Sequence, residues 1–264
     1  MPDPARYFDG APPRAIAHRG LALHAPENTL DAFRAALDAG TDILETDVHA
    51  SADGVAVICH DDDLARIAGV RLGVEQLPWE RLRDLTLVGG GALTTLETAL
   101  ACFPNARFNI DIKTDAALLP TIRAIRDAGA EPRVLVTSFR QRRRRRAVRA
   151  LPGAATSAST PGVVICLIGA WLRFAPLVRL ALRGVDAVQV PRRRGAVTVV
   201  SPGFVSAVHA AGKEVHVWTI DDPDEMRDLL ALGVDGIVTD RCDLLRAILH
   251  AGTGHNPRRS PGVT

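Results

Sequence analysis

Two short motifs place a histidine beside a charged residue. His18-Arg19-Gly20 follows the apolar run Ala15–Ala17, and His60-Asp61 follows the apolar run Val55–Cys59. Histidine has a free pKa close to neutrality, which suits it to transferring protons. Arginine suits a phosphate oxygen, because its planar guanidinium donates two parallel hydrogen bonds. Two histidines and an arginine at the ends of apolar runs therefore indicate acid–base chemistry on a phosphate.

Acidic residues at alternate positions are the second chemical feature. Glu45 and Asp47 are two apart in one apolar run, and residues two apart on a strand share a face. Asp111 and Lys113 have the same spacing in another run. Carboxylates on one inward face repel unless a cation lies between them, and an all-oxygen set favours Mg²⁺ or Ca²⁺. Two alternatives stay open: an outward, solvated Glu45–Asp47 pair and an internal Asp111–Lys113 ion pair.

The elements that would position these residues alternate along the chain. Short β-branched runs are separated by longer runs rich in Ala, Leu and Arg, a pattern typical of βα units and a parallel sheet. We therefore predict an α/β fold, a (β/α)8 TIM barrel, whose active site lies at the C-terminal ends of its strands. The predicted barrel strands are Ala15–Ala17, Ile43–Val48, Phe108–Ile112, Val134–Thr137, Ala154–Ser157, Ala187–Val190, Val215–Trp218 and Gly236–Val238.

Residues 50–91 interrupt this rhythm and are predicted to form a small insertion, a hairpin plus a loop, after the second strand. Asp53-Gly54 is typical of a hairpin turn, so Val55–His60 should run antiparallel to Thr46–His49. If residue 50 pairs with residue 55, His60 lies directly opposite Glu45. A shift of one residue would destroy that arrangement.

Helix boundaries and three further histidines complete the local predictions. Asn28 to Ala39 should be the first helix, with Asn28 as its N-cap, and Asp222 should cap a helix that begins with proline. We expect His24 in a loop and His216 buried and hydrogen-bonded in the core. His49 is interpreted as a surface residue of the hairpin, with a role at the rim of the site as the alternative.

The composition fits one barrel domain spanning residues 1–264. The chain is 47% hydrophobic with a formal net charge of +2, and its 4% aromatic content offers few surfaces for stacking bases, so no nucleic-acid partner is expected. The four cysteines lack metal-binding spacing and should be reduced. Residues 1–6 do not resemble a signal peptide, so we expect a cytoplasmic protein.

Two segments could contact a partner. Val163–Leu182 is apolar but contains two arginines, so we predict a barrel helix broken at Pro176, with weak contact to an anionic membrane surface as the alternative. The arginine run from Arg140 to Arg149 is interpreted as a solvated helix, with an anionic partner as the alternative.

The motifs taken together resemble the glycerophosphodiester phosphodiesterase family. Singly each match is weak, but their order and spacing across residues 14 to 241 make the resemblance specific. The matching residues are His18-Arg19-Gly20, Pro26-Glu27-Asn28-Thr29, Glu45-Thr46-Asp47, Asp53-Gly54, His60-Asp61, Asp111-Ile112-Lys113, Val217-Trp218-Thr219 and Thr239-Asp240-Arg241.

The resemblance implies metal-dependent hydrolysis of small-molecule glycerophosphodiesters to sn-glycerol 3-phosphate and an alcohol, with one divalent cation: Mg²⁺ or Ca²⁺, or Mn²⁺ as a third candidate. By position, the implied roles are His18 and His60 as general acid and base; Glu45, Asp47 and Asp111 as metal ligands; Arg19 and Lys113 as phosphate contacts; Trp218 as a substrate-packing aromatic; and Glu27 as a rim residue. Many members have Glu at position 111, so Asp111 is a departure.

Two other functions remain as hypotheses. The same site could cleave the headgroup of lysophospholipids, a lysophospholipase D reaction, with Val163–Leu182 helping to dock the lipid. A barrel that binds a metal or phosphate without catalysis is the non-enzymatic alternative. The motifs specify neither the headgroup, nor the oligomeric state, nor which histidine is the acid.

Overall fold

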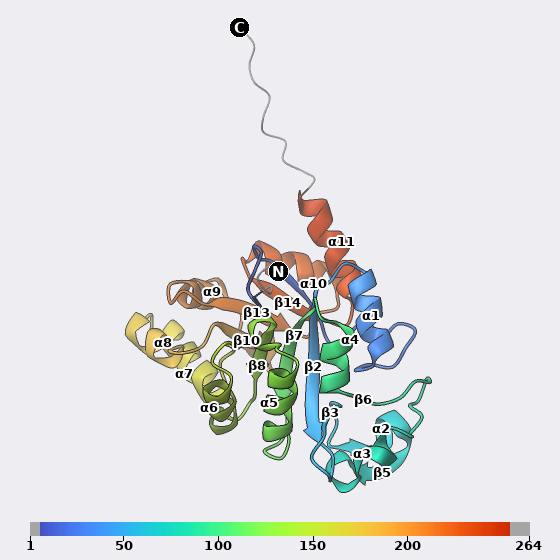
Figure 1. The fold of residues 1–264 in the computed structure, drawn as a ribbon. Coiled ribbons are helices and arrows are strands. Elements are labelled where there is room, and N and C mark those ends of the chain that lie inside the picture. Colours follow the sequence, from blue (N-terminus) through green and yellow to red (C-terminus); the bar gives the residue numbers. More distant parts are fainter. Residues whose placement is uncertain (1–5, 254–264) are drawn as a thin grey trace.

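The computed structural model describes residues 6–253, which form a ring of eight parallel strands surrounded by helices (Figure 1). Neighbouring strands follow the chain order, and a parallel bridge between Ser157 and Ala187 closes the ring. The predicted (β/α)8 barrel and all eight of its strands are therefore confirmed. The strands are β1 (Arg14–Ala17), β2 (Ile43–Ala50), β7 (Arg107–Ile112), β8 (Val134–Thr137), β9 (Ala155–Thr156), β10 (Ala187–Pro191), β13 (Glu214–Trp218) and β14 (Gly236–Thr239).

The helices cover the outside of the ring (Figure 1). They bury two apolar clusters against the outer faces of the strands, one centred on Phe33 and Phe108 and the other on Val188 and Phe204. Residues Met1–Ala5, part of the basis for the expected location, lie outside the described residues. The main helices are α1 (Leu30–Asp38), α4 (Leu96–Cys102), α5 (Leu118–Asp127), α6 (Gln141–Ala150), α7 (Thr160–Trp171), α8 (Ala175–Ala181), α9 (Pro202–His209), α10 (Pro223–Ala231) and α11 (Cys242–Thr253).

The start of α1 differs from the prediction by one residue. Thr29, not Asn28, is the N-cap, and its side chain accepts a hydrogen bond from the Ala32 amide. Asn28 is buried with φ +58°, and its side chain bonds to Thr46 and Asp47 of β2. Asparagine tolerates this left-handed conformation better than most residues, so Asn28 ties the first loop to the second strand. The predicted cap at Asp222 is confirmed.

The insertion after β2 has the predicted hairpin but not the predicted register. Val48 lies opposite Ile58 and Ala50 opposite Ala56, so the pairing of residue 50 with residue 55 is wrong by one position. The loop is one residue longer because the Ser51 amide donates to the Val55 carbonyl and the Val55 amide donates to Ser51 Oγ. The insertion contains β3 (Ala56–Ile58), β4 (Asp63–Leu64), α2 (Ala65–Ala68), β5 (Val70–Gly73), η1 (Val74–Gln76), α3 (Trp79–Leu82) and β6 (Thr94–Thr95).

The interior of the ring is layered along its axis. Inward side chains form an apolar middle layer that includes Ile16, Ile43 and Leu135, and Tyr7 packs against it from the N-terminal end. Polar and charged side chains lie on both sides of this layer. Those at the C-terminal ends of the strands open into a cavity, so the apolar layer separates that cavity from the opposite end of the barrel.

The apolar segment Val163–Leu182 is broken, as predicted. Helix α7 ends at Trp171 and α8 begins at Ala175, one residue before Pro176. No helix within residues 6–253 is both long enough and apolar enough to cross a membrane.

Candidate active site

A cavity of about 730 Å³ opens at the C-terminal ends of the strands. One wall carries charged side chains from the ends of β1, β2 and β7, and the insertion adds His60. The opposite wall is largely apolar and comes from α7 and the segments after β8 and β10. The structure thus gathers His18, Arg19, Glu45, Asp47, His60, Asp111, Lys113 and Trp218 around one cavity.

His18 directly follows β1 and is fixed by Asp240, which follows β14. Its Nδ1 lies 2.7 Å from Asp240 Oδ1, and its Nε2 lies 4.0 Å from Glu45 Oε2. Burial would lower the pKa of His18, but the hydrogen bond to Asp240 and the charge of Glu45 outweigh burial and raise it. Because Asp240 holds Nδ1, Nε2 is the atom free to exchange a proton with a ligand.

His60 lies at the same cavity, but the strand pairing that brings it there differs from the prediction. Continued along β2, the observed register would set His60 opposite Thr46 rather than Glu45. Strand β3 ends at Ile58, however, so His60 lies beyond the paired region and lines the cavity. Its Nδ1 lies 2.7 Å from Asp61 Oδ1, which again leaves Nε2 free. Both histidines are therefore oriented by a carboxylate on Nδ1.

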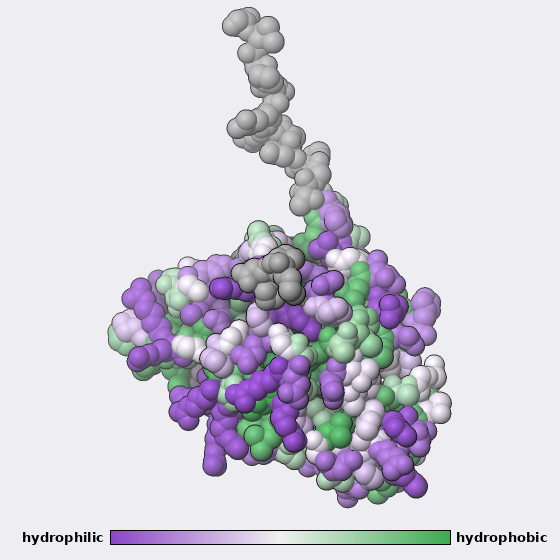
Figure 2. Space-filling model, in the orientation of Figure 1, coloured by the Kyte–Doolittle hydropathy of each residue, from purple (hydrophilic) through white to green (hydrophobic). Residues whose placement is uncertain are grey.

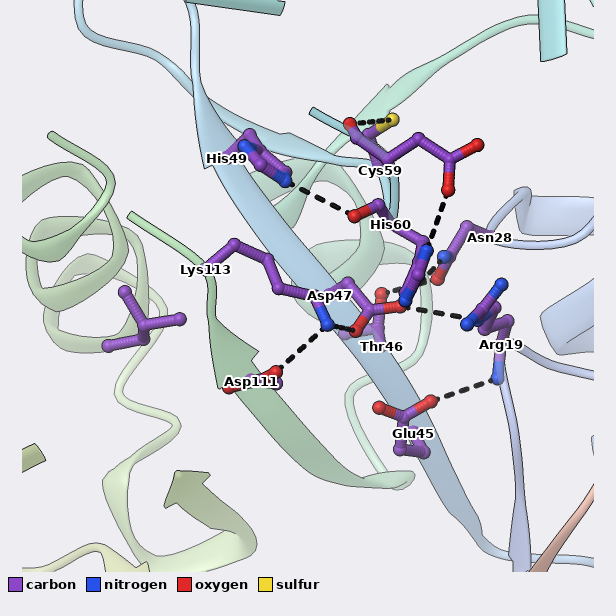
Figure 3. A network of polar contacts seen from close by, with 12 residues as sticks. Arg19, Asn28, Glu45, Thr46, Asp47, His49, Cys59, His60, Asp111 and Lys113 are labelled. Atoms are coloured by element: carbon purple, nitrogen blue, oxygen red, sulfur yellow. Dashed lines mark hydrogen bonds and ion pairs between the residues drawn. The ribbon is translucent and has the colours of Figure 1, made fainter. Parts of the chain in front are cut away.

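Three buried carboxylates and the ammonium of Lys113 form the charged wall (Figure 3). Lys113 Nζ lies 2.7 Å from Asp47 Oδ1 and 2.9 Å from Asp111 Oδ2, so the alternative of an internal Asp111–Lys113 ion pair is present in the structure. Burial would raise the pKa of Asp47, but Lys113 and Arg19 hold it below its usual range. For Glu45 the balance is reversed. Burial together with the charge of Asp47 outweighs the opposing charges of His18, Lys113 and Arg19 and raises the pKa of Glu45 to about 8.

The donor set suits a hard divalent cation. Asp111 Oδ1 is buried without a hydrogen-bond partner, and burial raises the pKa of Asp111. The same wall thus carries three carboxylates, those of Glu45, Asp47 and Asp111, and two fixed cations, Arg19 and Lys113. Oxygen donors are the ligands that Mg²⁺ and Ca²⁺ prefer. Within residues 6–253, no three His, Cys, Asp or Glu side chains are already arranged around a metal position.

Arg19 is held by the backbone as well as by its side chain. It has φ +54°, and its amide donates to the carbonyl and to Oε2 of Glu45. Its Nη1 donates to Glu27 Oε1 at 2.8 Å, and its Nε lies 3.4 Å from Asp47 Oδ2 without hydrogen-bond geometry. The next residue, Gly20, has φ +86°, and a Cβ there would lie 2.6 Å from the Ala32 carbonyl carbon. Only glycine fits this turn, which fixes Arg19 against Glu45.

The structure tests the predictions for three further histidines. His24 is exposed in a loop, and His216 is fully buried with its Nε2 2.9 Å from Glu214 Oε2; both agree with the predictions. The interpretation of His49 as a surface residue is wrong. It is 1% exposed, and its Nε2 lies 3.3 Å from the His60 carbonyl oxygen. His49 therefore supports the backbone that carries His60.

Residues 18–244 match the model of the Glycerophosphoryl diester phosphodiesterase family. The chain belongs to this family. It is 44% identical over 243 residues to probable glycerophosphodiester phosphodiesterase 2 of Mycobacterium tuberculosis, and the match covers 90% of each chain.

Solved structures of the family share the fold. A glycerophosphodiester phosphodiesterase of Parabacteroides distasonis superimposes with a TM-score of 0.75 at 25% identity, covering 92% of this chain and all of that one. A phosphodiesterase of Oleispira antarctica, solved in complex with the product sn-glycerol-3-phosphate, has a TM-score of 0.75 at 23% identity and covers 90% of this chain and 97% of its own.

Arg66 contacts two carboxylates beside the cavity, a connection that the sequence did not reveal. It lies in α2 of the insertion, where its Nε donates to Asp61 Oδ2 and its Nη2 to Glu27 Oε1, each at 2.6 Å. Arg66 therefore connects the carboxylate that orients His60 with the carboxylate that binds Arg19. One arginine among 32 basic residues carried no signal, because only the fold of the insertion brings it next to Asp61 and Glu27.

Arg143 was also missed, because it is one of a run of similar residues. The prediction of a solvated helix holds for Arg142, Arg145 and Arg146, which are exposed, but is wrong for Arg143 and Arg144, which are buried. Arg143 bonds to the backbone carbonyls of Ile112 and Lys113 and to Asp115. It thereby fixes the end of β7.

Proposed function

We propose that this family member catalyses metal-dependent hydrolysis of glycerophosphodiesters to sn-glycerol 3-phosphate and an alcohol. One observation carries the proposal: two histidines, each with Nδ1 held by a carboxylate, line the same cavity as an arginine, a lysine and three buried carboxylates. This set supplies the proton transfers and the positive charge that cleavage of a phosphodiester needs.

Arg19 and Lys113 are proposed to bind the phosphate. Both are cations on the charged wall of the cavity, and both lie close to the carboxylate of Asp47. Glu27 is proposed to be a rim residue that holds Arg19 in place, because its carboxylate accepts hydrogen bonds from Arg19 and Arg66. Trp218 is proposed to pack against the organic part of the substrate, because it lines the cavity beside Phe139, with ring centroids 6.3 Å apart.

His18 and His60 are proposed to move the protons. One Nε2 removes the proton from the attacking glycerol hydroxyl, and the other donates a proton to the oxygen of the leaving alcohol. Water then opens the resulting cyclic phosphate to glycerol 3-phosphate, and the two rings exchange roles. The carboxylate on each Nδ1 fixes the tautomer and stabilises the imidazolium when it forms, as in other aspartate–histidine pairs. A bell-shaped dependence of kcat/KM on pH is expected, since one ring must be neutral and the other charged.

Glu45, Asp47 and Asp111 are proposed to hold one divalent cation, Mg²⁺ or Ca²⁺, or Mn²⁺ as a third candidate. When bound, such an ion supplies positive charge that offsets the charge developing on the phosphate oxygens. The chain's own part is to keep these carboxylates buried and close to the phosphate-binding cations.

The test is an assay for glycerol 3-phosphate on glycerophosphocholine, glycerophosphoethanolamine and glycerophosphoglycerol. We expect turnover that is lost in EDTA and restored by one of Mg²⁺, Ca²⁺ or Mn²⁺. Tight metal binding with no product from any headgroup would instead support the non-enzymatic alternative. Full activity in EDTA would contradict the cation site.

Lysophospholipids are a second candidate substrate, favoured by the apolar wall of the cavity. Val163, Val164 and Leu167 of α7 line the cavity opposite the charged residues, so an acyl chain has an apolar path away from the phosphate position. Comparing turnover of glycerophosphocholine with that of lysophosphatidylcholine decides between the two. A lower KM for the acylated substrate is expected if the wall binds the chain, and no difference contradicts it.

A further inference from the structure

Charge is distributed very unevenly along this chain. Residues 132–213 contain fifteen of the 32 basic residues but only one of the 30 acidic residues, Asp186. This stretch comprises β8 to α9 and includes helices α6, α7 and α8. A near-neutral protein thus has one strongly basic sector, and the remainder of the chain is acidic.

The same sector has most of the exposed apolar side chains. Within residues 6–253, seven of the thirteen exposed large hydrophobic residues fall between residues 164 and 180, and Trp171 is 82% exposed. We call them the α7–α8 face: Val164, Ile165, Ile168, Trp171, Leu172, Phe174 and Leu180. Soluble domains rarely leave so many apolar side chains together in water, so the face is suited to an apolar partner.

Arginines surround this face. Arg173 lies between α7 and α8, and Arg179 and Arg183 follow on and after α8; all three are exposed. Exposed Arg193 and Arg194 of the β11–β12 hairpin (Arg193–Arg194 and Val197–Thr198) lie at the mouth of the cavity. Figure 2 shows hydrophilic and hydrophobic side chains gathered next to each other on the side that carries α6–α8.

The face is also continuous with the cavity. Val164 is exposed and lines the cavity wall, and Ile168 and Trp171 follow on the same side of α7, at helical spacings of four and seven residues. The apolar surface therefore runs without interruption from the active-site wall to the tip of α7.

We propose that the α7–α8 face docks on the surface of an anionic lipid bilayer. Trp, Phe and Leu side chains on a helix with arginines beside them match the interface, where the apolar groups enter the acyl region and the guanidiniums meet lipid phosphates. Docking in this orientation turns the mouth of the cavity towards the lipid.

Charge argues against the other two occupants of such a face. In a symmetric dimer, the face would contact its own copy, and two basic sectors would repel each other. A nucleic acid would satisfy the arginines but would leave the aliphatic side chains of α7 against a charged backbone. An anionic bilayer satisfies both kinds of side chain.

The decisive experiment measures sedimentation of the full chain with vesicles of phosphatidylcholine, with and without phosphatidylglycerol. We expect binding only with phosphatidylglycerol, and weaker binding as salt increases. Leu180→Glu should weaken it by about tenfold or more, and Arg179→Gln by about fivefold. Leu119→Glu is the matched control, because Leu119 is 59% exposed on α5, outside the basic sector, and should leave binding unchanged.

The outcomes separate docking from the proposed reaction. Equal effects of Leu180→Glu and Leu119→Glu, or equal binding to both vesicles, would overturn the proposal. So would a dimer in light scattering that Leu180→Glu dissociates. Docking should also raise the turnover of lysophospholipid embedded in the vesicles, and only this expectation rests on the proposed function. If the wild-type chain does not hydrolyse soluble glycerophosphodiesters, the proposed function is contradicted, but the result for vesicle binding still stands.

Discussion

Both ends of the barrel bury a glutamate, but burial and neighbouring charges shift the pKa of the two carboxyl groups in opposite directions. At the N-terminal end, Arg14 makes two 2.8 Å hydrogen bonds to Glu214, which also contacts His216. Burial would raise the pKa of Glu214, but Arg14 and His216 lower it to about 2. At the C-terminal mouth, burial and Asp47 raise the pKa of Glu45 to about 8.

The two ends differ in whether their buried polar groups have partners within the chain. The N-terminal charges are satisfied within the chain and so stabilise the folded state. At the mouth, Arg19 Nε, Asn109 Oδ1 and Asp111 Oδ1 are buried without hydrogen-bond partners. Unsatisfied polar atoms cost stability, and they are expected where a ligand or ion completes the set. Substitutions should therefore affect activity at one end and stability at the other.

The largest effect is expected from the two histidines of the mouth. His18→Ala and His60→Ala should each lower turnover of glycerophosphodiesters by about 10²–10⁴-fold, because each removes a proton-transfer group. The urea midpoint should change little, since both rings lie at the cavity surface. His24→Ala, in an exposed loop, is the control. Full metal-dependent activity in either variant would contradict their assignment.

A buried ion pair at the other end should give the reverse result. Arg14→Met leaves the carboxylate of Glu214 without its main partner and should lower the free energy of unfolding by about 3–5 kcal/mol. Turnover per folded molecule should stay unchanged. Urea titration and product assay measure both, and the double variant Arg14→Met/Glu214→Met should recover most of the lost stability. Loss of turnover in folded Arg14→Met would remove the distinction between the ends.

Two Glu→Gln variants should respond to pH with opposite signs. The folded-state pKa of Glu45 lies above its ordinary 4.5, so wild-type stability without metal falls as pH rises from 4.5 to about 8. In EDTA at pH 8, Glu45→Gln should be the more stable protein by on the order of 1–3 kcal/mol, although it should lose activity.

Glu214→Gln should behave oppositely. The folded-state pKa of Glu214 lies below 4.5, so its contribution is fully present above pH 4.5 and is lost as pH falls towards about 2. The variant should therefore be less stable than wild type at neutral pH and nearly equal to it near pH 2. Urea titrations across pH measure both variants, and the same sign in both would refute the comparison.

The smallest effect is expected from Arg66, which acts through other residues. Arg66→Met should lower turnover by about tenfold, because Asp61 and Glu27 lose the guanidinium that connects them. The urea midpoint should stay the same, since Arg66 is about half exposed. Arg71→Met, at an exposed position of β5, is the control. An equal loss in both variants would mean that the insertion as a whole, not Arg66, was perturbed.

Local patterns explain which predictions succeeded. The barrel strands are short apolar runs whose period is unambiguous, and alternation alone indicated that Glu45 and Asp47 share a face. The register of the β2–β3 hairpin failed because it depends on how Ser51 and Val55 close the turn, a difference of one residue. His49 was misread for a related reason: its burial depends on the insertion that covers it.

Sequence alone determined the barrel, the position of each charged residue at a strand end, and the family. These follow from periodicity and from motifs within a few residues of one another. The tertiary structure decided which carboxylate orients which histidine, that Arg66 and Arg143 support the site, and that the apolar residues of α7 and α8 are exposed. Those facts depend on contacts between segments far apart in the chain, where small differences in loop length and packing change every neighbour.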